Sequence, residues 1–99
     1  MNLIEVSSVY LTMFQEITGE REEKVKVQDG ATLKDLLEIL CGRYGKKFRD
    51  VLFDPESGAV YSHNHITLNG GLAHLLDKNF EIKLKDGDHV VIAHAVSGG

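Results

Sequence analysis

The chain has 99 residues, a formal net charge of −4 and one cysteine, Cys41. This length suits a single domain over residues 1–99 with a core of its own, and one cysteine excludes an internal disulfide and a four-thiolate metal site. The acidic balance argues against nucleic-acid binding, no apolar run approaches the ~20 residues of a membrane span, and no targeting segment opens the chain, so we expect a soluble, cytoplasmic protein.

The N-terminal part predicts a hairpin. Val9–Phe14 alternates β-branched and aromatic residues with a period of two, which is typical of a strand. Lys24–Val27 alternates polar and apolar residues and is the clearest half-exposed strand of the chain. The charged residues between them are expected to form a solvated turn. The two strands would then pair in antiparallel fashion, with one face of the hairpin exposed to solvent.

The next stretch predicts the main helix. Thr32 stands at the N-cap position, and Asp35 three residues later completes a variant of the capping box. Apolar residues follow at i, i+3, i+4, i+7 and i+11, and Gly42 or Gly45 ends the pattern. The members of this apolar stripe are Leu33, Leu36, Leu37, Leu40 and Tyr44. A single stripe indicates a helix that packs across one face of a sheet.

The second half of the chain is expected to form short strands separated by turns. Lys46–Phe53 fits either a short helix or an extended segment, and the segment from Asp54 to Asn64 fits an exposed loop. The expected strands are Ile66–Leu68, Phe80–Leu84 and Val90–Ala93, with turns at Asn69–Gly71 and Asp86–Asp88.

The order strand, strand, helix and further strands predicts an α+β fold of the β-grasp, or ubiquitin-like, kind. A mixed sheet of four to five strands would pack on the one main helix. The crossover after that helix would place the C-terminal strand parallel to the first strand, at the centre of the sheet.

The sequence ends in Gly98-Gly99, which has two readings. Chain ends fray commonly, and glycine tolerates this best. Alternatively, two residues without side chains let the terminal carboxylate enter a narrow channel and attack the α-phosphate of ATP. The resulting acyl-adenylate could then be displaced by a sulfur or amine nucleophile. In the second reading the domain presents a reactive end to other enzymes.

Several stretches, in order, resemble the MoaD/ThiS family of sulfur carriers, nearest to the small subunit of molybdopterin synthase. They are the opening strand and turn over Val9–Gly19, the helix start Asp29–Leu37 (DGATLKDLL), Ile66–Gly70 (ITLNG), Leu84–Val90 (LKDGDHV) and the terminus Val96–Gly99 (VSGG). Each motif is weak alone. Their order and the diglycine make the resemblance specific.

The resemblance implies that an ATP-dependent, E1-like activating enzyme adenylates Gly99, beside Gly98, and converts its carboxylate to a thiocarboxylate. The large subunit of molybdopterin synthase, or an equivalent acceptor, would then receive the sulfur. It implies no bound cofactor and no metal, since ATP is used by the activating partner. The chain is thus a carrier or the small subunit of a sulfurtransferase, with no catalytic group beyond its terminal carboxylate.

Two departures leave the pathway open. Most members of the family place prolines before the terminal valine, where this chain has His94-Ala95, and the segment from Asp54 to Asn64 is longer than in compact carriers. Thiamine-type sulfur transfer and ubiquitin-like conjugation through Gly99 therefore remain alternatives. A binding module with an incidental diglycine is a third.

Six residues are candidates for partner binding. Phe14, Leu68, Val91 and Ile92 are apolar residues on strands expected near the tail, where they form either core or an exposed patch. His94, expected to line the path of the tail, and Val96, in the tail itself, complete the set.

Three other features are expected to be structural. His63-x-His65 has a spacing that a zinc site uses, but no cysteine or carboxylate pattern completes it, so a solvated loop is favoured. Cys41 is expected to be a small buried apolar residue rather than a redox or acyl-accepting thiol. Lys46, Lys47 and Arg49 are expected to form a solvated basic face.

Overall fold

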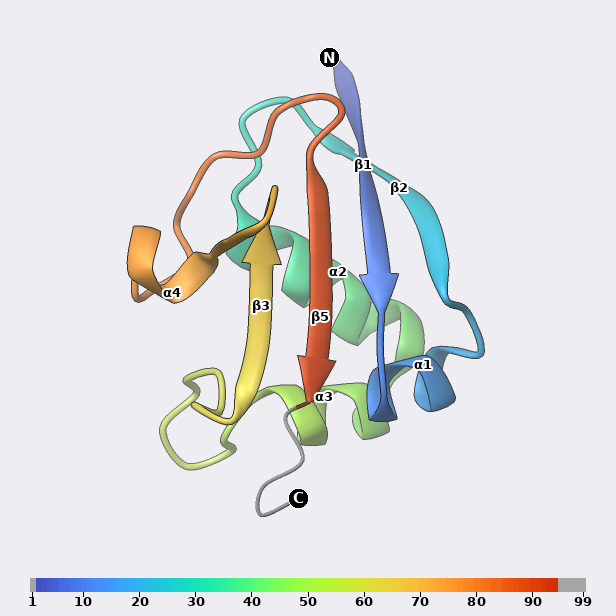
Figure 1. Cartoon of the computed structure of the whole chain (residues 1–99), viewed down its shortest axis with the longest axis vertical. Helices are drawn as coiled ribbons and strands as arrows, with labels where there is room; N and C mark the ends of the chain where they lie inside the picture. Colours follow the sequence, from blue (N-terminus) through green and yellow to red (C-terminus); the bar gives the residue numbers. More distant parts are fainter. Residues whose placement is uncertain (1, 95–99) are drawn as a thin grey trace.

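The computed structural model describes residues 2–94, which form five strands and four helices. Figure 1 shows a sheet with the longest helix running behind it. In chain order the strands and helices are β1 (Leu3–Tyr10), α1 (Met13–Thr18), β2 (Glu22–Gln28), α2 (Leu33–Tyr44), α3 (Lys46–Leu52), β3 (Asn64–Leu68), β4 (Gly71–Leu72), α4 (Ala73–Leu76) and β5 (His89–His94). None of the helices within residues 2–94 has the length and apolarity that crossing a bilayer requires.

The sheet is mixed, with the strand order β2-β1-β5-β3-β4. β1 pairs with β2 in antiparallel register, and β5 lies parallel to β1 on one side and antiparallel to β3 on the other. The last strand therefore runs through the centre of the sheet beside the first (Figure 1). This confirms the predicted α+β architecture and the predicted position of the C-terminal strand.

Helix α2 covers one face of the sheet, as its apolar stripe predicted. The Thr32 side chain accepts a hydrogen bond from the Asp35 backbone N–H (3.1 Å), and the Asp35 carboxylate accepts one from the Thr32 N–H (3.0 Å). The capping box is thus complete, and Gly45 ends the helix. The stripe residues Leu33, Leu36, Leu37 and Leu40 are fully buried. Together with the inward residues of the strands they form the core.

Within residues 2–94, no helix covers the opposite face of the sheet (Figure 1). Val91 of β5 points to this open face, because its strand neighbours Val90 and Ile92 are fully buried on the other one. Val9 of β1 and Thr67 of β3 are its register partners on either side. All three are partly exposed, so the open face has a partly apolar centre.

The strand predicted over Val9–Phe14 is wrong in its bounds. β1 begins at Leu3 and ends at Tyr10, and residues Met13–Thr18 form helix α1. Thr12, between them, has φ 53° and ψ −126°, so the chain reverses direction there. The apparent alternation combined the end of a strand with the first turn of a short helix.

The strand predicted over Phe80–Leu84 does not form; only Lys83 makes an isolated bridge, to Thr32. The carbonyls of Ile82 and Phe80 instead accept hydrogen bonds of 2.8 Å from the first N–H groups of α2, at Leu33 and Lys34. Those N–H groups have no partner inside the helix. The segment therefore caps α2 and is not a strand of the sheet, and its alternating apolar side chains pack on the core.

The turn before β5 matches its prediction. Gly87 has φ 87°, which favours glycine, and the Asp86 carboxylate accepts a hydrogen bond from the Glu5 N–H (2.8 Å). The Asp88 carboxylate accepts from Asn69 Nδ2 (3.0 Å) and from the Lys85 N–H (2.8 Å). Both turns at this end of the sheet are thus tied together where β5 begins.

Candidate functional site

Three of the predicted site residues, Val96, Gly98 and Gly99, lie outside the described residues. The structure describes the chain up to His94, the last residue of β5. The candidate site is therefore the end of β5 together with the open face of the sheet that leads to it.

The end of β5 is held by strands on both sides. Ile92 lies opposite Ile66 of β3 and Tyr10 of β1, and His94 lies opposite Asn64. The Leu11 N–H donates a hydrogen bond of 3.0 Å to the Ile92 carbonyl, just beyond the last residue of β1. A central strand paired on both sides resists local opening better than an edge strand. The chain is therefore in a defined position when it reaches His94.

His94 itself makes both side-chain and backbone contacts. Its Nδ1 lies 3.0 Å from Oδ1 of Asn64, a residue of which only 6% is exposed. Its backbone N–H donates a hydrogen bond of 3.1 Å to the Thr12 hydroxyl. His94 is thus half-buried and hydrogen-bonded through both its ring and its backbone.

His63 and His65 do not come together as a pair. The His63 ring stacks on Tyr61 at 4.9 Å between ring centroids and meets the His94 ring edge-on at 4.7 Å. His65 is exposed on the open face, opposite Ala93. Within residues 2–94, no three His, Cys, Asp or Glu side chains are arranged to hold a metal ion.

Burial corrects three of the predicted docking residues. Phe14 and Ile92 are fully buried and Leu68 is 8% exposed, so all three belong to the core and offer no surface to a partner. Val91 alone of this set is partly exposed, on the open face. The four were grouped by apolarity, but neighbouring residues of a strand point to opposite faces, which separates Val91 from Ile92.

Other apolar residues near the open face were missed. Leu72 of β4, opposite Thr67, is 37% exposed, and Leu75 and Leu76 of α4 are 74% and 62% exposed. The apolar run that follows Asn69-Gly70-Gly71 was the available signal. It was read only as a crossover between strands. The open face therefore extends from Val9, across Val91, to the β4–α4 edge of the sheet.

Cys41 and the basic residues after α2 are structural. Cys41 is 3% exposed, and burial raises the pKa of its thiol to about 11. Arg49 pairs with Glu38 (2.8 Å) and Lys46 with Asp50. Two of the three basic side chains are thus paired with carboxylates at the surface.

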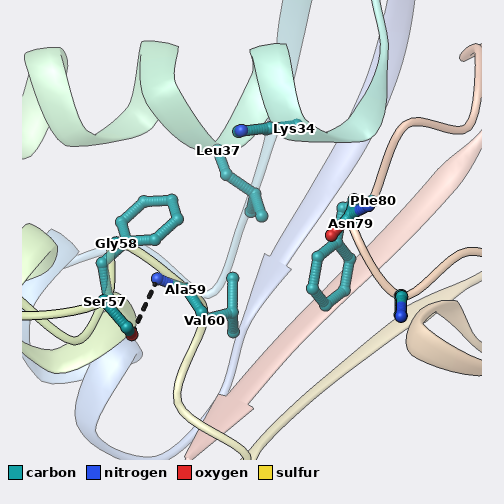
Figure 2. A pocket seen from close by; sticks show the side chains of 10 residues that line it. Lys34, Leu37, Ser57, Gly58, Ala59, Val60, Asn79 and Phe80 are labelled. Carbon is teal, nitrogen blue, oxygen red and sulfur yellow. Dashed lines mark hydrogen bonds between the residues drawn. The ribbon is translucent and has the colours of Figure 1, made fainter.

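A cavity of about 250 Å³ lies behind β3, between α2 and the loop that follows α3. Figure 2 shows Leu37, Val60 and Phe80 pointing into it, with the Ser57 hydroxyl accepting a hydrogen bond from the Ala59 N–H. Lys34, Lys78 and Asn79 line its rim, and its lining includes no histidine, cysteine or carboxylate. The cavity thus lacks a pair of groups for acid–base chemistry, whereas the end of β5 leads toward the predicted site at Gly99.

Comparison with known proteins agrees with this geometry. The ThiS family model matches residues 9–99. A comparison with curated proteins finds no match.

Several solved structures similar to this chain come from archaea. The HVO 2177 protein of Haloferax volcanii is 29% identical with a TM-score of 0.83, over 98% of this chain and 88% of that one. The small archaeal modifier protein 1 of Methanosarcina acetivorans is 26% identical with a TM-score of 0.77, over 100% of both chains. A Pyrococcus furiosus protein provisionally described as molybdopterin converting factor subunit 1 is 27% identical with a TM-score of 0.73, over 94% of this chain and 99% of that one.

Proposed function

Because the chain belongs to the ThiS family of ubiquitin-like sulfur carriers, we propose that it carries sulfur as a thiocarboxylate on Gly99 and donates it in molybdopterin biosynthesis. The family match carries this proposal, since it extends through Gly98 and Gly99. The similarity to the Pyrococcus furiosus protein favours the molybdopterin pathway.

The chemistry requires activation of a poor electrophile. A carboxylate oxygen of Gly99 attacks the α-phosphate of ATP, pyrophosphate leaves, and the acyl-adenylate forms. A sulfide-equivalent nucleophile from the sulfur donor then adds to the carbonyl carbon and AMP leaves, which gives the thiocarboxylate. After the sulfur has passed to the acceptor's substrate, an oxygen from water restores the carboxylate. The activating partner supplies the ATP site and the electrostatic stabilisation.

The open face supplies a docking surface for that E1-like partner. Val91 and Ala93 lie on β5, the strand that leads to the tail, so a protein bound there would also be next to the departing chain. Val9 and Leu72 extend the apolar area on either side. An interface core of this kind is typically apolar with a polar rim, which His65, His89 and Lys24 would provide.

A second candidate is a protein modifier conjugated through Gly99. The similarity to small archaeal modifier protein 1 over both whole chains favours it. Both candidates share the adenylation step and differ in the nucleophile. Sulfur attack gives the carrier, and attack by a lysine amine gives the conjugate.

Intact-mass spectrometry after incubation with ATP, an activating enzyme and a sulfur donor tests the first candidate. We expect the mass gain of one oxygen-for-sulfur exchange, located at Gly99 by fragmentation. A variant that lacks Gly98 and Gly99 is the matched control, because it keeps residues 2–94 and should show no gain. Absence of the exchange with several activating enzymes would rule the carrier out.

Further experiments distinguish the molybdopterin pathway from protein modification and from the thiamine-type pathway. The thiocarboxylated protein is mixed with the large subunit of a molybdopterin synthase and its sulfur-free precursor, and dithiolene product is expected. Isopeptide-linked conjugates in extracts, lost on removal of Gly99, would instead indicate the modifier. Sulfur transfer to a thiazole precursor alone would indicate the thiamine-type pathway.

A further inference from the structure

We infer that Thr12 and Asn64 are positioning residues for the charging of the tail: Thr12, which follows β1, and Asn64, in β3, hold His94 from opposite sides and so fix where the chain leaves the domain. The inference rests on the proposed function. It adds two contacts, of Thr12 and of Asn64 with His94, that would orient the tail without touching the reacting carboxylate.

The side chain of Asn64 has every polar group engaged. Its Nδ2 donates to the carbonyl oxygens of Val51 (3.0 Å) and Leu52 (3.1 Å), at the end of α3. Both hydrogens are therefore used, so the amide orientation is fixed and Oδ1 faces Nδ1 of His94 at 3.0 Å. Since Oδ1 can only accept, the proton of the neutral imidazole lies on Nδ1. Asn64 thus connects the end of α3 to the ring of His94.

Thr12 holds the backbone of the same residue from the other side. Its hydroxyl accepts the His94 N–H (3.1 Å), and its single hydrogen lies within reach of the carbonyls of Leu11 (2.7 Å) and His94 (3.2 Å). β1 has already turned away toward α1, which lies beside the end of β5 (Figure 1). The hydroxyl therefore replaces the backbone partner that β1 no longer offers to β5.

The backbone of Thr12 is strained in this position. A β-branched residue at φ 53° and ψ −126° is a genuine outlier, and such conformations persist only where the surroundings fix them. Glycine would fit the backbone better but has no hydroxyl to hold His94. A threonine at this strained position, with its hydroxyl bonded to the last residue of β5, is the observation that points to a role for the hydroxyl.

The contacts of Asn64 and Thr12 with His94 differ in solvent exposure, which predicts which of them holds His94 more strongly. Asn64 is buried and its contact with His94 is partly shielded, whereas Thr12 is exposed. Hydrogen bonds exposed to water contribute less to the net free energy. Loss of the Asn64 contact is therefore expected to affect the tail more than loss of the Thr12 contact.

The test uses two matched pairs of variants in the full chain. His94→Asn keeps an N–H donor near the position of Nδ1, and His94→Asp places an acceptor of the same shape against Oδ1 of Asn64. Thr12→Ser keeps the hydroxyl, and Thr12→Val removes it without changing the shape of the side chain. Each pair separates the hydrogen bond from the size of the residue.

The first readout is the charging reaction, followed as ATP-dependent pyrophosphate release with an activating enzyme. We expect kcat to fall about tenfold in His94→Asp and less in Thr12→Val, because a displaced reacting group lowers the rate of the bound complex. In Thr12→Val, KM should stay within about twofold, since Thr12 is not part of the docking surface, and Thr12→Ser should retain the wild-type kcat. His94→Asn should have a kcat closer to that of the wild type than His94→Asp. A purely structural role would lower the melting temperature without this split.

The second readout needs no partner. Hydrogen exchange of the backbone amide at position 94 should accelerate at least about tenfold in His94→Asp and Thr12→Val. Exchange at Ile92 should stay unchanged. If exchange and kcat are both at wild-type values in these variants, the hold of Thr12 and Asn64 on His94 is refuted while the carrier function stands. If exchange accelerates but the variants are charged with the same kcat as the wild type, the positioning role is refuted. If the wild type is not charged at all, the proposed function fails and the positioning role fails with it.

Discussion

The Tyr10 hydroxyl, buried beneath α2, donates a hydrogen bond of 2.6 Å to Oε2 of Glu23. Tyr44 of α2 donates to the same oxygen, and Arg43 pairs with Oε1 at 2.9 Å. Burial raises the pKa of Tyr10, and the bond to Glu23 raises it further, so the phenol stays a protonated donor. One carboxylate thus ties β1 and β2 to α2.

This network predicts a loss of stability in acid. Burial alone would raise the pKa of Glu23, but the hydrogen bonds from Tyr10 and Tyr44 and the charge of Arg43 hold it below its usual 4.5. The stabilisation is therefore complete above about pH 4.5 and disappears as the pH falls through the lowered pKa. Glu23→Gln should lose about 2 kcal/mol at pH 7. Urea unfolding from pH 7 to pH 3 should show this difference shrinking in acid; a constant difference would contradict the assignment.

Cys41 should be unreactive while the domain is folded. With its pKa raised to about 11 by burial, roughly one thiol in a thousand is ionised at pH 8, against about a quarter for a free cysteine. We expect negligible labelling by a disulfide reagent in buffer and one thiol labelled per chain in denaturant. Rapid labelling of the native protein, at the rate of a free thiol, would show that the site opens.

The capping box should contribute measurably to α2. Thr32→Ala leaves the Asp35 N–H at the start of the helix without its partner and is expected to cost about 1 kcal/mol, as for other N-caps. Thr32→Ser keeps the acceptor and should be close to the wild type. Denaturant titration followed by circular dichroism measures both, and equal midpoints for the two variants would count against the cap.

Val91 and Ile92 should respond in opposite ways although they are neighbours. Ile92 is fully buried, so Ile92→Ala should cost about 3 kcal/mol of stability. Val91 faces the open side, so Val91→Arg should change stability by less than about 1 kcal/mol while weakening binding to the activating enzyme at least about tenfold. Calorimetric titration with that enzyme and thermal unfolding measure the two effects. Wild-type affinity in Val91→Arg would remove the open face as the docking surface.

The hydrophobic pattern of the sequence predicted correctly the elements whose signal is local in the sequence. The stripe of α2 and its capping box are local, and both were confirmed. The central place of β5 followed from the handedness of crossover connections. The helix α3, over Lys46–Leu52, was left open against an extended segment because its pattern is short.

The elements that were wrong depend on contacts distant in the sequence. Phe80–Leu84 alternates like a strand, but its carbonyls serve the N-terminus of α2, nearly fifty residues earlier. Leu3–Tyr10 was recognised only at its end, since buried Ser7 and Ser8 interrupt its apolar pattern. The contact of Thr12 and Asn64 with His94 carries no sequence signal, because it joins three separate segments.

The central position of β5 has a consequence for synthesis. Until residues His89–His94 have been made, β1 with β2 and β3 with β4 lack the strand that joins them. A nascent chain therefore cannot close its sheet before its final strand emerges, and domains fold as units. The sheet and the end of β5 that leads to the tail therefore form together, late in synthesis.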